Sequence, residues 1–239
     1  MIWLTWRQQR TETLIAALLL ALVVALLVPT GLHMASVYED DGIAACLTNS
    51  SVSCNSTVDS FVSRWDPLRN LVSWLNLVPA LLGVLIAAPF VLEFERGTFR
   101  LSWTQSVTRG RWLATRIGLI VGASVAASAL LTLLMTWWRR PLDAASSRLE
   151  DGFDFEGLVP SAYTLFAAAL VIAIGVVLRR AAASIGLSLI AFLVARIAIA
   201  AWARPNYQDP IRETSQGDVG TTLRDAWDFS QGEELVVPD

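Results

Sequence analysis

The chain has 239 residues, of which 54% are hydrophobic and 16% are charged, and its formal net charge is −3. With a mean hydropathy of +0.53, this composition excludes an ordinary soluble domain and indicates an integral membrane protein. All 18 basic residues are arginine. Because a Walker A phosphate loop needs a lysine, the chain cannot hold ATP with that motif.

Five apolar stretches, each close to the ~20 residues that cross a bilayer, predict an all-α protein with five transmembrane helices. The expected spans are 13–33, 71–92, 117–138, 161–178 and 185–203. We therefore expect a transmembrane domain over 1–203 and a polar extracytoplasmic tail over 204–239. The first stretch is too long for the apolar part of a cleaved signal peptide, so we expect it to remain as a helix.

Charge predicts the orientation of these spans. If the N-terminus is cytoplasmic, the inner segments 1–12, 93–116 and 179–184 hold nine arginines and three acidic residues. The outer segments then hold eight arginines and eighteen acidic residues. Arginine density in short inner segments is the pattern of the positive-inside rule, so we predict a cytoplasmic N-terminus and a C-terminus on the outer side.

Two cysteines, Cys46 and Cys54, lie in the first outer loop. Outside the cytoplasm a disulfide between them would close a short loop, and we favour this over two separate thiols. Two cysteines are too few for a closed zinc site, so we expect no metal.

The second span contains Asn76 and two prolines, Pro79 and Pro89, which remove backbone donors and can kink a helix. In the third span Gly118, Gly122 and Ala126 follow a four-residue spacing that lets helix backbones approach closely. In the following outer loop, Asp154 and Glu156 are interpreted as solvated charges rather than as a catalytic pair.

Arg196 is the charge that lies well inside a predicted span. Burial in lipid is costly, so its side chain either lines a substrate path, snorkels, or meets a structural partner. We favour the last two interpretations, and we give Asn76 the same pathway-or-structural status.

The inner loop EFERGTFRLSWTQSVTRGRWLATR is basic and amphipathic. It either lies on anionic lipid headgroups or docks a cytosolic partner. Here the sequence resembles the permease subunits of type-two ABC exporters, especially their actinobacterial branch. The resemblance rests on WLTWRQQR at 3–10, on Glu93, Glu95, Gly97 and Thr98 followed by LSWTQSVTRGRW at 101–112, and on Gly157, Pro160, Tyr163, Phe166, Arg179, Arg180, Arg196 and RPNYQDP at 204–210.

The resemblance implies that a coupling helix within about 93–116 docks on a separate ATP-binding subunit. That subunit would bind ATP and Mg, two permease copies would pair as a homo- or heterodimer, and the complex would lie in a bacterial plasma membrane. We expect no cofactor on this chain and no nucleic-acid partner. The residues that would contact the ATPase and transmit its closure are Glu93, Glu95, Gly97, Thr98, Thr104, Gln105, Arg109 and Arg111.

The family usually has six spans, and we expect 204–239 to precede a sixth. Two other functions stay open. An accessory or immunity-type membrane protein would bind a partner without forming a path. A membrane enzyme is disfavoured, because the chain has one histidine, His33, and neither HExxH nor GxSxG.

Overall fold

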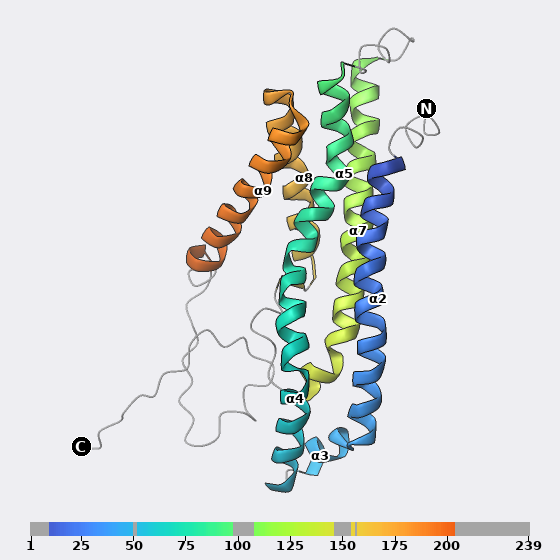
Figure 1. The fold of residues 1–239 in the computed structure, drawn as a ribbon, viewed down its shortest axis with the longest axis vertical. Coiled ribbons are helices and arrows are strands. Elements are labelled where there is room, and N and C mark those ends of the chain that lie inside the picture. Colours follow the sequence, from blue (N-terminus) through green and yellow to red (C-terminus); the bar gives the residue numbers. More distant parts are fainter. Residues whose placement is uncertain (1–9, 50–51, 98–107, 146–153, 156, 204–239) are drawn as a thin grey trace, which may run out of the picture.

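The computed structural model describes residues 10–49, 52–97, 108–145, 154–155 and 157–203. These residues form a bundle of long helices (Figure 1). The elements are α2 (Arg10–Asp40), α3 (Ile43–Asn49), α4 (Val52–Ser73), the 3-10 turn η1 (Trp74–Leu77), α5 (Val78–Glu95), α7 (Arg109–Ala145), α8 (Val159–Leu178), α9 (Ala181–Ala198) and the π-helical turn η3 (Ile199–Ala203).

The predicted all-α class with five membrane-spanning segments is confirmed. Helical segments long and apolar enough to cross a bilayer are found over 14–40, 56–95, 109–145, 159–178 and 181–202. The predicted tail, 204–239, lies outside the described residues.

Three helices extend further than their apolar stretches predicted. The region 34–70, expected to be a loop, is largely helical, and α7 begins at Arg109 instead of at 117. A helix of 37 residues such as α7 is about 55 Å long, against a hydrocarbon layer of about 30 Å. At the disulfide end, α2 and α4 pack on each other beyond the predicted spans through buried Met34, Phe61 and Trp65. At the loop end, the early turns of α7 pack on α5 through buried Trp112.

We call the end of the bundle at which α5 ends and α7 begins the loop end, and the opposite end, which carries α3, the disulfide end (Figure 1). At the disulfide end α2, α4 and α7 enclose a core of large side chains, including Phe61, Trp65, Trp138 and Leu142. The core near the loop end joins α5, α7, α8 and α9 and contains smaller residues beside Phe90 and Trp112.

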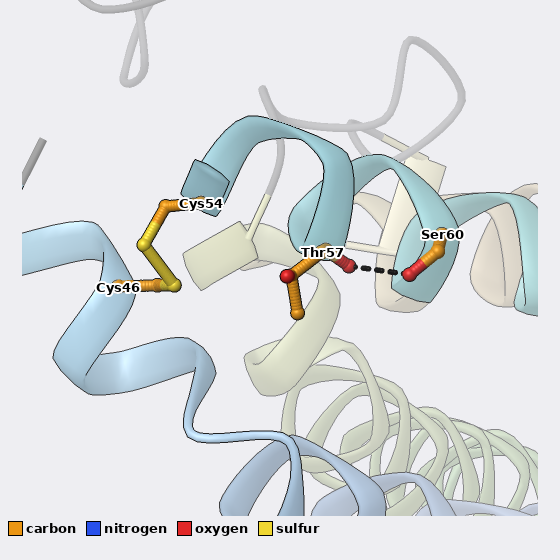
Figure 2. Close-up of a disulfide and its surroundings, with 4 residues drawn as sticks. All are labelled: Cys46, Cys54, Thr57 and Ser60. Atoms are coloured by element: carbon orange, nitrogen blue, oxygen red, sulfur yellow. Dashed lines mark hydrogen bonds between the residues drawn. A yellow bond between two sulfur atoms is a disulfide. The ribbon is translucent and has the colours of Figure 1, made fainter. Parts of the chain in front are cut away.

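A disulfide joins Cys46 of α3 to Cys54 of α4, with their Cα atoms 5.2 Å apart (Figure 2). On α4, the Ser60 hydroxyl donates to the Thr57 carbonyl at 2.8 Å (Figure 2). The cross-link fixes the short helix α3 to the end of α4.

Glycines set the closest contact in the bundle, between α5 and α8. A Cβ added to Gly83 would overlap the backbone oxygen of Thr164, and one added to Gly175 would overlap the side chain of Val91. The spacing at Gly118 and Gly122 predicted close approach there instead, but both glycines have open space beside them within this chain. Helices associate in lipid through such close backbone contacts, because apolar side chains gain little free energy when they move from lipid into a helix interface.

Candidate functional site: the loop end and its links to α7 and α9

The last turn of α5 carries Glu93, which forms an ion pair with Arg116 of α7 at 2.5 Å. Their side chains are only 14% and 10% exposed. The Arg116 guanidinium also lies 6.0 Å from the Trp112 ring centroid, a cation–π distance. These contacts fasten the end of α5 to the beginning of α7.

Three aromatic rings strengthen the same junction. Phe90 and Phe94 of α5 have ring centroids 5.0 Å apart, and both contact Trp112, at 6.0 and 6.3 Å. Aromatic pairs at such distances contribute beyond their buried area. The segment between α5 and α7 therefore starts and ends at one rigid junction.

Gly97 ends α5 with φ of +67°. Its N–H donates to the Phe94 carbonyl at 3.3 Å, which closes the helix in the manner of a left-handed glycine cap. The interpretation of Gly97 as a turn residue before the coupling segment agrees with this backbone.

Glu95, the last residue of α5, contacts α9. Its Oε2 accepts a hydrogen bond from the Ala181 backbone N–H at 2.8 Å. Ala181 is the first residue of α9, and the N-cap residue Arg180 makes no side-chain cap. A carboxylate from another helix thus supplies the acceptor that Ser, Thr, Asp or Asn normally supplies locally.

The other residues of the expected ATPase contact divide into two groups. Arg109 and Arg111 lie exposed on the first turn of α7. Thr98, Thr104 and Gln105 lie outside the described residues. The structure therefore brings Glu93, Glu95 and Gly97 to one end of the bundle with the two arginines, and engages both carboxylates within the chain.

A second polar cluster surrounds Arg196 on α9. Its Nη2 pairs with Oδ2 of Asp154 at 2.5 Å, and its guanidinium lies 5.4 Å from the Tyr163 ring centroid. The interpretation of Asp154 as a solvated loop charge is wrong, because the residue is 6% exposed. A buried cation in a membrane helix needs a counter-charge, and Asp154 provides it.

Arg196 also reaches Asn76, the other residue singled out with it. Its Nη1 donates to the Asn76 carbonyl at 2.7 Å. Asn76 lies in η1, where a 3-10 turn would take its partner three residues ahead, at Pro79, which has no N–H. Arg196 therefore supplies a donor at the break between α4 and α5.

Residues 17–204 match the family described as ABC-2 membrane transporter related. The chain belongs to this family. No match was found among curated proteins or among solved structures. Membership makes the chain an ABC-2 type membrane protein, a class whose permeases work with an ATP-binding subunit. The matched ABC-2 region includes both polar clusters and all five candidate spans, the first of them from residue 17 onward.

Sequence reasoning missed three partners in this ABC-2 protein: Arg116, Ala181 and Asp154. For Ala181 a signal existed, since α9 begins RRAAAS without a capping residue and its first N–H groups require an acceptor from elsewhere. For Asp154 the signal was the charge of Arg196 itself, placed inside an apolar span. Neither signal identifies which of the several carboxylates in the chain is the partner.

Proposed function

We propose that the chain is the membrane-spanning, non-catalytic subunit of an ATP-driven ABC exporter in a bacterial plasma membrane. In this proposal the N-terminus and the loop end are cytoplasmic, and residues 93–116 contain the coupling segment. Two permease copies pair with two ATP-binding subunits, which bind ATP and Mg. We place the chain in the actinobacterial branch of these exporters because 3–10 and 101–112 resemble that branch.

One observation carries the proposal beyond family membership: the junction at the base of the coupling segment. The Glu93–Arg116 pair and the ring of Trp112 fasten α5 to α7 on both sides of residues 98–107. A force applied to the segment would then move two helices together instead of being absorbed by a loose loop.

We infer a different division of labour among the site residues from the contacts within the chain. Glu93 and Glu95 are used within the chain, so contact with the ATPase falls to the segment 98–107 and to exposed Arg109 and Arg111. Glu93 and Glu95 instead fix α5 to α7 and to α9, and so position the helix ends next to these contact residues.

A matched pair of charge reversals on α7 tests this assignment. Arg111→Glu lies at the loop end and Arg140→Glu lies near the disulfide end, and both arginines are exposed. In mild-detergent pull-downs of the full chain, we expect Arg111→Glu and Thr104→Ala/Gln105→Ala to weaken recovery of the ATPase. For the charge reversal the loss should be about tenfold or more, because like-charge contacts at an interface cost several kcal/mol.

The control Arg140→Glu should recover the ATPase at the wild-type level. If no ATP-binding protein is recovered even with the wild-type chain, the exporter assignment fails and the accessory-protein hypothesis takes its place. Equal recovery from all variants would contradict the placement of the docking surface at the loop end.

A further inference from the structure

The face of α9 that packs against its neighbours consists mostly of small side chains. The buried positions of α9 are Ala181, Ser184, Ser188 and Phe192, mostly small residues at three- and four-residue spacing. Both serine hydroxyls donate within their own helix, Ser184 to the Ala181 carbonyl at 2.8 Å and Ser188 to the Ile185 carbonyl at 2.9 Å. Phe192 fixes the far half of α9 to α8 through ring contacts with Tyr163 and Phe166, at 5.7 and 6.1 Å between centroids. The small residues of the first half pack closely but make no such directional contact with α5.

The polar contacts that join α9 to other elements lie near its two ends, within the part of the chain that the structure describes. Glu95 holds its first residue, and Arg196 holds η1 and Asp154 near its last turn. Of the two, only Glu95 belongs to the α5 turn from which the coupling segment departs, shortly before residue 98.

The local sequence makes this dependence stronger. Helices α8 and α9 are joined by just Arg179 and Arg180, and Arg180 has the extended backbone of an N-cap, with φ −135° and ψ 109°. Its side chain cannot accept a hydrogen bond, and its positive charge is unfavourable at the positive end of a helix dipole. The Glu95 carboxylate supplies both the missing hydrogen-bond acceptor and a negative charge at the start of α9.

From this geometry we infer that Glu95 is the positioning residue that transmits movement of the coupling segment to α9, by capping α9 from α5. Glu93 performs the corresponding task for α7 through Arg116. This inference rests on the proposed function, since it describes how the ATP-driven step reaches one particular helix.

A cap moved into the α8–α9 turn separates capping from transmission. In Glu95→Ala/Arg180→Ser, the new hydroxyl can cap α9 locally, but the helix loses its link to α5. Arg180→Ser alone and Glu95→Gln serve as controls. The first leaves the Glu95 contact in place, and in the second a glutamine oxygen can still accept from Ala181.

The first measurement uses the full chain alone in detergent and follows amide hydrogen exchange in the first turn of α9. Glu95→Ala should speed exchange about fivefold, as expected for loss of a typical helix cap. The double variant and Glu95→Gln should restore protection. Unchanged exchange in Glu95→Ala would overturn the capping step whatever the protein's function.

The second measurement uses the complex with its ATPase in nanodiscs and spin labels at two exposed positions. One label replaces Ile197 on α9 and the other replaces Leu133 on α7; these side chains are 65% and 70% exposed. With Mg-ATP, the spectrum of each label, which reports its local mobility, should change in the wild type. In the double variant the spectrum of the α7 label should still change, and that of the α9 label should not.

The outcomes separate the inference from the proposal beneath it. A normal α9 response in the double variant would overturn transmission through Glu95 and leave the exporter assignment intact. Absence of any response in a wild-type preparation, with no ATPase bound, would overturn both, while the exchange result would still decide the cap.

Discussion

The two ends of the bundle are held together by different physics. At the disulfide end a covalent bond, Cys46–Cys54, and a core of large side chains join α2, α3, α4 and α7. At the loop end α5 meets α7 through the Glu93–Arg116 pair and the rings of Phe90 and Trp112, whereas α9 meets α5 through the Glu95 hydrogen bond. The core between α5, α8 and α9 consists mainly of small residues.

The difference teaches where movement is possible. Large interdigitating side chains and a cross-link resist sliding, whereas small residues and a few charged contacts permit discrete rearrangement. The disulfide end is thus built as a rigid body, whereas at the loop end the start of α9 is positioned against α5 by an individual contact.

The largest expected effect tests the close contact between α5 and α8, on the side of the bundle away from the disulfide. Gly83→Val would drive a side chain into the backbone of Thr164 and into Ala167. Because backbone cannot yield as a flexible side chain does, we expect a loss of about 3 kcal/mol or more in unfolding free energy. Gly122→Val adds the same group where space is open.

Denaturant titration of both variants in detergent checks this expectation. Comparable destabilisation by the two valines would mean that the α5–α8 approach does not determine stability. Wild-type stability in Gly122→Val and a large loss in Gly83→Val would establish that the α5–α8 contact determines stability.

The next effect concerns Arg196, which reaches from α9 to the break in the second span. Asp154→Ala would leave the Arg196 cation partly buried with its counter-charge removed. Removal of one partner from a fully buried pair costs about 3–5 kcal/mol. Because the Arg196 side chain is 16% exposed, we expect about 2 kcal/mol.

The double variant Asp154→Ala/Arg196→Met supplies the control, measured in the same titrations. It should be more stable than Asp154→Ala alone, since the lone charge rather than the lost pair carries most of the cost. A double variant less stable than either single one would show that the pair itself holds α9 in place.

The apolar stretches predicted the fold class because lipid imposes both the helix and its length. They did not predict that α2 and α7 would extend beyond the bilayer, because those extensions depend on packing between Met34, Trp65 and Leu142, which come from different helices. Within this chain the close contacts occur at Gly83 and Gly175, which no spacing pattern marked, and not at Gly118 and Gly122.

The candidate site was predicted in location more than in detail. Sequence alone marked Glu93, Glu95 and Arg196 as charges with a role. It could not assign their partners, because the contacts of Glu95 and Arg196 join residues 86 and 42 positions apart, respectively. Partners at such separations are chosen by the packing of helices, which no local pattern records.

The smallest expected effect concerns backbone strain in the α8–α9 turn, beside the Glu95 cap. Arg179 has φ of 52°, in the left-handed region, where a side chain with a Cβ costs roughly 1–2 kcal/mol. Arg179→Gly removes that strain but gives the unfolded chain more freedom, which offsets roughly 0.5–1 kcal/mol of the gain. We expect a net stabilisation of about 0.5 kcal/mol, seen as a small rise in the thermal midpoint in detergent.

Arg180→Gly distinguishes strain from charge, because it removes the same charge from an adjacent residue whose backbone is extended, with φ of −135°. Its extended backbone gains nothing from glycine's freedom, and loss of the unfavourable charge at the start of α9 is offset by the greater freedom of the unfolded chain, so we expect almost no net change in stability. If both glycine variants raise the midpoint equally, the unfavourable energy in this turn comes from repulsion between the two arginines and not from the left-handed backbone. A rise for Arg179→Gly alone would place the strain at Arg179, in the short turn that Glu95 holds against α5.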